Sequence, residues 1–280
     1  MPRISELSLG FSGCPNDTAV FYALVSKRIE LPGIRFLERI RDVEELNRSC
    51  LQGILDVSKV SFHAVGHLIP QYALLRSGAA LGRGCGPLIV SRPGRSLDEL
   101  HLGRVAVPGV YTTAQLLLNL FSKERCRETP MLFSDILLAV AEGTVDYGLI
   151  IHEGRFTYGG YGLVALQDLG NWWEKETGLP IPLGGIVIKR SHGAALAGSV
   201  EAAIRQSLAY YHSHPGEAGA FIREHAQEMD DEVTRRHIEL YVTAETMALS
   251  EEGEEAVRVL LARARERRLI PDSRDPLFLT

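Results

Sequence analysis

Short apolar runs alternate along the chain with segments that have the hydrophobic spacing of helices. Residues 7–12 (LSLGFS) predict a strand, and residues 18–25 (TAVFYALV) predict a helix that is apolar on nearly every face and therefore buried on more than one side. The same alternation predicts further strands at 34–39, 56–61, 86–91, 104–109 and 145–151, and further helices at 43–52, 63–75, 114–121 and 133–142. This order of elements indicates the α/β fold class.

Two turn-rich segments, 92–96 (RPGRS) and 179–182 (LPIP), interrupt this pattern. The expected boundaries are a discontinuous larger lobe of residues 1–92 and 181–280, an inserted smaller lobe of residues 96–176, and crossings near 92–96 and 177–182. Two α/β lobes joined by two crossings enclose a ligand cleft, as in the type 2 periplasmic-binding-protein architecture. That topology alone indicates little about function.

Composition and charge argue against nucleic acid and membranes as ligands. The 280 residues are 45% hydrophobic and 23% charged, with a formal net charge of -5, so the chain has material for a full core but no basic field for nucleic acid or an anionic membrane. No secretory signal and no membrane-spanning run is evident. We expect a cytoplasmic protein that acts on a small molecule, and the oligomeric state stays open.

The pattern of cysteine and histidine residues gives no sign of a metal centre. The cysteines stand far apart and form no CxxC pair: Cys14, Cys50, Cys85 and Cys126. Cys14 precedes a helix, where a thiolate is stabilised, but a small residue in a tight turn is the simpler interpretation. His63 and His67 have metal-pair spacing, yet the segment HAVGH lacks the glutamate of HExxH. We therefore expect no bound metal.

His152 is the side chain best placed for acid–base chemistry. It directly follows the apolar run 145–151, which suits an interior strand of a parallel sheet. Ligands of open α/β sheets bind beyond the carboxyl ends of the strands, where an imidazole can accept a proton near neutral pH. A lone histidine beside apolar residues is more often structural. The position at the strand end favours catalysis.

Other polar residues could hold an anionic ligand, and each has a plainer explanation. Thr112 and Thr113 begin a helix after a turn, which suits a carboxylate site or a simple N-cap equally well. Lys59 and Ser61 end the 56–61 strand and would face the same cleft, or be a surface lysine and a strand terminator. Arg155 could clamp an anion or pair with Glu153.

Several segments together resemble one enzyme family, 1,4-dihydroxy-6-naphthoate synthase of the futalosine route to menaquinone. They are LGFSGCPNDTAVFYALV, KVSFHA, RSGAALGRGCGPLIV, VAVPGVYTTA, GLIIHEGRFTY and LGNWWEKETGLPIPLG, in order from about Leu7 to the C-terminus. The resemblance implies a cytoplasmic enzyme with the two-lobed fold and without metal or redox cofactor. It would convert cyclic de-hypoxanthine futalosine to 1,4-dihydroxy-6-naphthoate with release of a three-carbon sugar fragment.

The resemblance also implies roles for particular residues. The histidine of the family's IIHE motif falls on His152, as the proton acceptor. The substrate-binding motifs fall on two triplets: Lys59, Val60 and Ser61, and Thr112, Thr113 and Ala114. Three positions depart from the usual pattern: Gly13 replaces a proline, Gly154 replaces a serine and Thr243 replaces an asparagine.

Two alternatives remain. Chorismate dehydratase shares the fold and the pathway, although the IIHE histidine and the paired threonines favour the synthase. A solute-binding protein that only captures a small anion would need a secretion signal or a lipoprotein cysteine, and residues 1–10 show neither.

Overall fold

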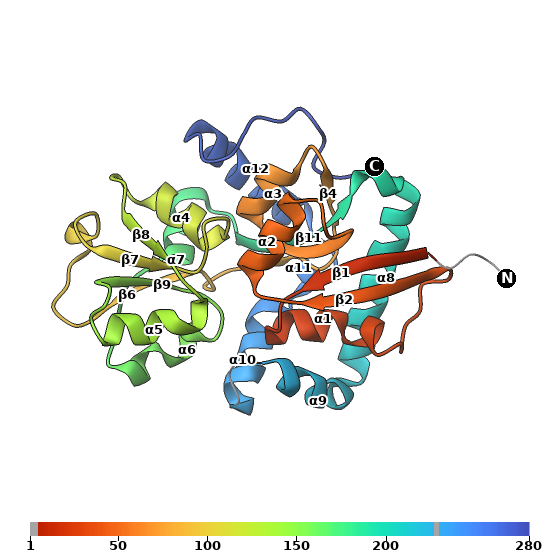
Figure 1. Cartoon of the computed structure of the whole chain (residues 1–280), viewed down its shortest axis with the longest axis horizontal. Coiled ribbons are helices and arrows are strands. Elements are labelled where there is room, and N and C mark those ends of the chain that lie inside the picture. Colours follow the sequence, from red (N-terminus) through yellow and green to blue (C-terminus); the bar gives the residue numbers. More distant parts are fainter. Residues whose placement is uncertain (1–4, 227–229, 280) are drawn as a thin grey trace.

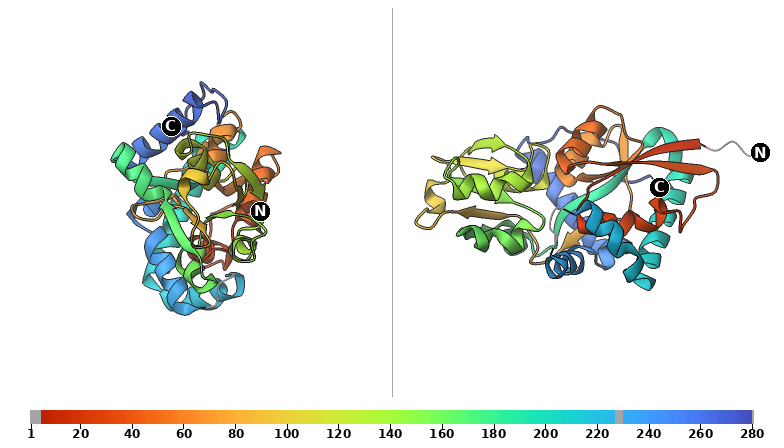
Figure 2. Two further views of the ribbon diagram at one scale, coloured as in Figure 1. Left: turned by 90° about the vertical axis from the view of Figure 1, so that its left-hand side faces the viewer. Right: turned by 60° about the horizontal axis from the view of Figure 1, so that its bottom comes forward.

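Two β-sheets, each with helices on both faces, form two lobes that lie side by side along the long axis of the molecule (Figure 1 and Figure 2). This computed structural model describes residues 5–226 and 230–279. The lobes confirm the predicted two-lobed α/β class.

The first sheet has the strand order β2-β1-β3-β11-β4, and β5 also pairs with β11. Its strands are β1 (Ser5–Phe11), β2 (Ile34–Ile40), β3 (Val57–Ser61), β4 (Tyr72–Leu74), β5 (Ala80–Gly82) and β11 (Ile181–Lys189). β1 runs parallel to β2 and β3, whereas β11 runs antiparallel to β3, β4 and β5. The late strand β11 therefore closes a sheet that the first third of the chain begins.

The second sheet has the order β10-β6-β9-β7-β8. Its strands are β6 (Leu88–Ser91), β7 (Arg104–Val107), β8 (Arg127–Pro130), β9 (Tyr147–Ile150) and β10 (Val164–Asp168). β9 is the central, fully buried strand, as its apolar run predicts. The expected parallel surroundings are wrong in part, because β9 is parallel to β7 but antiparallel to β6. A strand buried on both faces is apolar in either direction, so the sequence pattern could not decide between them.

Helices fill the segments between the strands and most of the C-terminal third. They are α1 (Pro15–Val25), α2 (Val43–Leu51), α3 (Phe62–Leu68), α4 (Thr113–Phe121), α5 (Phe133–Ala141), α6 (Gly154–Thr157), α7 (Leu169–Thr177), α8 (Gly193–Ser213), α9 (Pro215–His225), α10 (Asp231–Tyr241), α11 (Ala244–Met247) and α12 (Glu251–Glu266). Single 3-10 turns are η1 (Leu97–Glu99), η2 (Tyr158–Tyr161) and η3 (Arg190–His192). The predicted helix 63–75 is wrong beyond Leu68, since residues 72–74 pair with β11 as β4.

The helices divide between the two faces of each sheet (Figure 1). In the first lobe α1, backed by α8, α9 and α10, packs on one face, and α2, α3 and α12 pack on the other. In the second lobe α4 and α7 cover one face and α5 covers the other. One apolar cluster runs from α3 and α12 into α4 and α7, so it joins the lobes on that side. Burial of continuous apolar surface is the main stabilising term for such a fold.

The first crossing between the lobes lies earlier than the predicted 92–96. β6 was expected in the larger lobe, but it pairs with β9 and β10 in the second sheet, so the chain crosses at residues 83–87 and returns at 178–180. The turn-rich segment after β6 instead connects it to η1 within the second lobe. A Cβ on Gly86 would lie 2.0 Å from the main-chain nitrogen of Gly170, so this crossing is packed directly against the start of α7.

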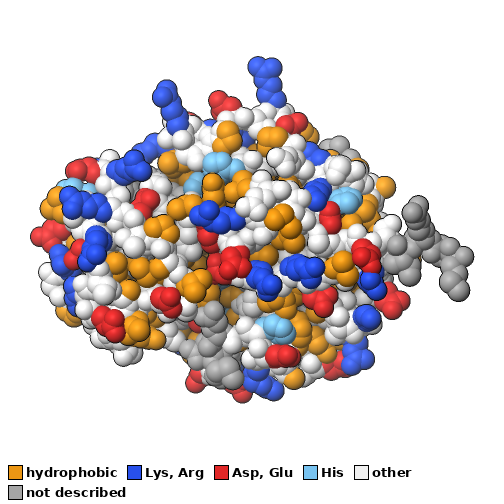
Figure 3. Space-filling model, in the orientation of Figure 1, with side chains coloured by type: hydrophobic (Ala, Val, Ile, Leu, Met, Phe, Trp, Pro, Cys, Tyr) orange, Lys and Arg blue, Asp and Glu red, His pale blue; other side chains and the backbone are white. Residues whose placement is uncertain are grey.

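Charged side chains of both signs are interspersed over the face shown in Figure 3, with apolar side chains between them. This mixed surface agrees with the small net charge of -5. Within residues 5–226 and 230–279, no helix has the length and apolar character needed to cross a membrane.

A buried histidine on α3 predicts acid sensitivity. His63 is 6% exposed, and its Nε2 lies 3.3 Å from the carbonyl oxygen of Leu269. Burial, and then the neighbouring His67, lower the pKa of His63 to about 4. The unfolded chain therefore binds the extra proton more readily than the folded one. The resulting stability is present above the ordinary histidine pKa and is lost as pH falls from about 6.5 towards 4.

Replacing His63 with glutamine should therefore reduce the loss of unfolding free energy between pH 7 and pH 4. Wild-type protein should lose on the order of 2–3 kcal/mol of unfolding free energy through this side chain between pH 7 and pH 4. Urea denaturation at a series of pH values measures it, and exposed His212→Gln is the matched control. Parallel losses in wild type and His63→Gln would rule out His63 as the cause.

Candidate active site

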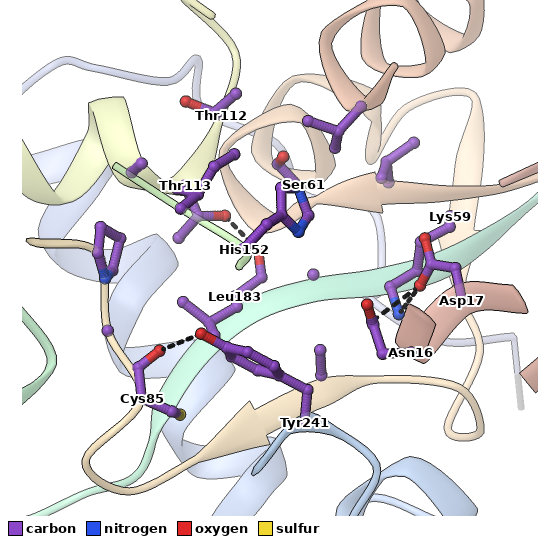
Figure 4. A pocket seen from close by; sticks show the side chains of 18 of the residues that line it. Asn16, Asp17, Lys59, Ser61, Cys85, Thr112, Thr113, His152, Leu183 and Tyr241 are labelled. Carbon is purple, nitrogen blue, oxygen red and sulfur yellow. Dashed lines mark hydrogen bonds and ion pairs between the residues drawn. The ribbon is translucent and has the colours of Figure 1, made fainter. Parts of the chain in front are cut away.

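A cavity of about 100 Å³ lies between the lobes (Figure 4). Both lobes contribute to its lining: Asn16, Asp17, Val43, Lys59, Val60, Ser61, Ala80, Cys85, Gly86, Pro87, Thr112, Thr113, Ala114, Ile151, His152, Arg155, Leu183, Gly184 and Tyr241. All eight residues that the sequence selected are among them. The cavity thus brings together segments that are far apart in the chain, at the ends of β3 and β9 and the start of α4.

His152 follows β9 at its carboxyl end, and its ring points into the cavity (Figure 4). Its backbone has φ of 55°, a left-handed conformation that is uncommon for residues other than glycine. Nδ1 lies 2.7 Å from Cys14 Sγ, and the ring packs 4.9 Å from that of Phe133, centroid to centroid. The contact at Nδ1 leaves Nε2 as the nitrogen that a bound molecule can use.

Two residues beside His152 were not selected from the sequence as site residues. Cys14 is the N-cap of α1 and is 8% exposed; its Sγ also lies 3.3 Å from Nε2 of His237 on α10. Burial raises the pKa of the Cys14 thiol well above its usual value, with further increases from Glu153 and Asp17. The interpretation as a mere small turn residue is therefore incomplete, since the thiol contacts both imidazoles.

His237 is 1% exposed, and burial, followed by the charge of His152, lowers the pKa of His237 well below its usual value. Its Nε2 lies 3.2 Å from Oδ1 of Asn16, whose own Nδ2 donates to Asp17. Because an amide oxygen only accepts, His237 Nε2 must carry the ring's proton. The unprotonated Nδ1 has no hydrogen-bond partner in the described part of the chain.

Lys59 is buried and not the surface lysine of the plainer explanation. Its Nζ forms an ion pair with Asp17 at 3.1 Å and donates to the carbonyl of Gly78 at 2.9 Å. Asp17 also accepts from the amide and hydroxyl of Ser12. Since Asp17 neutralises Lys59, the pair offers hydrogen-bonding groups to the cavity with little net charge.

Val60 and Ser61 form the end of β3 and the entry to α3. The Ser61 hydroxyl accepts from Nδ2 of Asn47 at 3.2 Å, and its amide donates to Oδ1 of the same asparagine. This paired contact fixes the orientation of Ser61 beside the cavity. The hydroxyl keeps its own proton to donate to a ligand.

Thr112 and Thr113 are both engaged within the protein. Thr112 is the N-cap of α4, accepting from the amide of Gln115 and donating to the carbonyl of Gly109. Thr113 Oγ1 accepts from the Phe62 amide at 2.8 Å and donates to the carbonyl of Leu183 at 2.5 Å. The donors left at this helix start are the main-chain amides of its first turn, which have no partner inside the helix.

The Thr113 hydroxyl thus links the smaller lobe to β11 and α3 of the larger one. Replacing Thr113 with valine removes the hydrogen-bond partner of the buried Phe62 amide and of the half-buried Leu183 carbonyl. We expect a loss of about 1–3 kcal/mol in unfolding free energy, measured by urea denaturation. Thr113→Ser retains the hydroxyl and serves as the control. Equal losses in both variants would mean that the methyl group, and not the hydrogen bonds, matters.

Arg155 does not pair with Glu153. Its guanidinium donates to the carbonyls of Gly86 and Gly84 at 2.7 and 2.8 Å and to the Asp168 carboxylate at 2.6 Å. The side chain therefore fastens the first crossing to β10, at the edge of the cavity. Glu153 is buried, and its Oε2 has no hydrogen-bond partner among the described residues.

The structure shows what surrounds each of the three departures from the family pattern. A Cβ on Gly13 would lie 2.5 Å from the His225 carbonyl oxygen, so this loop has no room for a larger residue as it stands. Gly154 has ordinary space around it. Thr243 is the N-cap of α11 and forms a capping box with Thr246. None of these three positions displaces a group that lines the cavity.

Comparisons with known proteins show the family of this chain. A family profile described as menaquinone biosynthesis matches residues 7–266. The chain is 48% identical over 277 residues to a 1,4-dihydroxy-6-naphthoate synthase of Thermus thermophilus, covering 99% of this chain and 100% of that protein. It is 42% identical over 271 residues to the enzyme of the same name from Streptomyces coelicolor, covering 95% of each chain.

Solved structures show the same fold. A protein from Archaeoglobus fulgidus superposes with a TM-score of 0.89 at 33% identity, covering 95% of this chain and 98% of that one. The alkanesulfonate-binding protein SsuA of Xanthomonas axonopodis pv. citri superposes with a TM-score of 0.74 at 14% identity, covering 97% and 96%. The latter likeness shows the periplasmic-binding-protein fold alone. Taken with the family profile and the two relatives of known name, the chain belongs to the menaquinone-biosynthesis family that includes the 1,4-dihydroxy-6-naphthoate synthases.

Proposed function

We propose that this protein is a carbon–carbon lyase that converts cyclic de-hypoxanthine futalosine to 1,4-dihydroxy-6-naphthoate in the cytoplasm, with His152 as the proton acceptor. The observation that carries the proposal is the position of His152 at the end of the central strand β9, with its ring in the cavity between the lobes. The names of the two relatives, both 1,4-dihydroxy-6-naphthoate synthases, support the proposed product.

The substrate carboxylate is placed at the start of α4. The main-chain amides of Thr113 and Ala114 are free of intrahelical partners, and the positive end of the helix dipole lies at the same point. The Ser61 hydroxyl lines the same part of the cavity, since the next residue, Phe62, donates its amide to Thr113 Oγ1 at 2.8 Å. Because Asp17 neutralises Lys59, the attraction for the anion comes chiefly from the helix start.

His152 needs a defined tautomer to act as the base. For Nε2 to take a proton from the substrate, Nδ1 must hold the proton of the neutral ring, and Cys14 Sγ at 2.7 Å can accept it in a hydrogen bond. Proton removal from the sugar-derived ring lets the carbon–carbon bond to the spiro centre break. The released electron pair completes the aromatic naphthalene, so no external oxidant is consumed.

The walls of the cavity would assist the reaction by positioning the substrate and by excluding water. Most lining residues are buried, including Lys59, Ser61, Thr112 and Thr113. A substrate held between the lobes would meet a fixed imidazole in a largely dry site, where orientation lowers the barrier.

The direct test is incubation of the purified protein with cyclic de-hypoxanthine futalosine, followed by chromatography. We expect stoichiometric naphthoate and the three-carbon fragment. Turnover of chorismate in a parallel incubation would support the dehydratase instead. Tight binding of the futalosine derivative without product would support a non-catalytic binding protein.

A further inference from the structure

Three soft or borderline metal ligands converge at the edge of the cavity. They come from three separate segments: Cys14 at the start of α1, His152 after β9 and His237 on α10. Their ligand atoms, Sγ and two imidazole nitrogens, all lie within 4.8 Å of one another. The sequence could not reveal this group, because Cys14 is 138 residues from His152 and 223 from His237.

The donor set fits a particular class of cation. One thiolate and two imidazoles are preferred by Zn²⁺ and similar borderline cations, which bind them at about 2.0–2.3 Å in tetrahedral geometry. Those bond lengths separate the donor atoms by about 3.5 Å. The Cys14 sulfur lies 2.7 Å from His152 Nδ1 and 3.3 Å from His237 Nε2, and all three atoms lie within 4.8 Å, so side-chain shifts would bring them to coordinating distance.

The three ligands also bridge the cleft. Cys14 and His237 belong to the larger lobe, and His152 belongs to the smaller one. We propose that Cys14, His152 and His237 bind a divalent cation of the zinc class, which crosslinks the two lobes and inhibits the enzyme. Cation binding does not depend on the proposed function, whereas the inhibition rests on the proposed function.

The inhibition follows from the nitrogen that the cation would occupy. A cation on His152 Nδ1 forces the proton of the neutral ring onto Nε2, the nitrogen that must take a proton from the substrate. Cys14 loses its thiol proton to solvent when the sulfur–metal bond forms. The same imidazole therefore cannot serve as ligand and as base.

The site should bind reversibly and more weakly than a structural zinc site. It offers three protein ligands, whereas structural zinc sites have four. Coordination through His237 Nε2 also moves the ring proton to the buried Nδ1, which has no hydrogen-bond partner in the described chain. Leaving such a donor unpaired costs about 1–3 kcal/mol, and this offsets part of the binding energy.

Cobalt titration of the purified full-length protein tests the site without requiring turnover. We expect a thiolate-to-cobalt charge-transfer band at one equivalent of Co²⁺ that is displaced by Zn²⁺. Cys14→Ser should abolish the band. His152→Asn and His237→Gln should each weaken affinity by more than the roughly 10–100-fold that loss of an outer-shell partner costs. Cys126 is a buried cysteine in the smaller lobe, so Cys126→Ser is the matched control and should bind the cation normally.

Circular dichroism of each variant establishes that it is folded. No charge-transfer band in folded wild type, or an unchanged band in Cys14→Ser, would overturn the site. Unchanged affinity of His152→Asn for the cation would overturn the crosslink between the lobes, because no ligand would then come from the smaller lobe. A separate assay should show that Zn²⁺ inhibits naphthoate formation by wild type and by Cys126→Ser. If the cation binds but neither protein forms product without it, the proposed function fails while the site stands.

Discussion

Replacing His152 with asparagine should lower naphthoate formation by about 10²–10⁴-fold, the range that a positioned general base contributes. Asparagine removes the basic nitrogen but tolerates the left-handed backbone that His152 adopts, with φ of 55°. Alanine would add backbone strain and confuse a catalytic loss with a structural one. The measurement is product formation at saturating substrate, alongside substrate affinity by calorimetry.

We expect the affinity of His152→Asn for substrate to stay within about tenfold of wild type, because the carboxylate is held at the start of α4 and not by the imidazole. His212→Asn on the exposed end of α8 is the matched control, and it should keep full activity. Substantial residual turnover by folded His152→Asn would refute the assignment of the base.

The position of His152 could be predicted from the local sequence pattern. An apolar run of strand length predicts a buried strand, and the next polar residue then lies at the carboxyl end of that strand, where α/β proteins bind ligands. The same logic located Ser61 at the end of β3, and the helix-start pattern located Thr112 before α4. All of these residues line the observed cavity.

The partners of His152 could not be found in this way. Cys14 and His237 contact it only because α1 and α10 pack side by side in the larger lobe, more than 200 residues apart in sequence. No local pattern distinguishes His237 from any other polar residue on an amphipathic helix. Its burial, at 1% exposure, is a property of the assembled fold.

The errors in the fold have a similar origin. β6 is buried at all four positions, so its sequence is equally compatible with either sheet, and the first crossing was placed after it. The sequence pattern assigns β4 to a helix, because three residues are too few to show the two-residue alternation of a strand. Tertiary pairing with β11 decided that segment.

Replacing Asp17 with asparagine should lower the unfolding free energy by about 3–5 kcal/mol, the cost of leaving one buried partner of an ion pair uncompensated. The side chains of Asp17 and Lys59 are only 5% and 7% exposed and lie 3.1 Å apart. Asparagine preserves the shape but leaves the Lys59 ammonium without its counter-charge. Urea denaturation followed by circular dichroism measures the loss.

The exposed pair of Glu232 and Arg235 provides the comparison. Those side chains are 60% and 57% exposed, and Glu232→Gln should lower the unfolding free energy far less than Asp17→Asn because solvent screens the pair. A loss in Asp17→Asn no larger than this would show that the buried pair contributes little.

Combining Asp17→Asn with Lys59→Met separates charge from packing. Methionine fills much of the volume of the lysine stem and removes the orphan charge, so the double variant should lose less stability than the sum of the two single losses. Turnover should nevertheless stay low in the double variant. The Asp17 carboxylate also holds the amide and hydroxyl of Ser12, two residues before the thiol that contacts His152. Stability recovered without activity would therefore indicate that apolar packing can replace the ion pair in the fold but not in the cavity, which both side chains line.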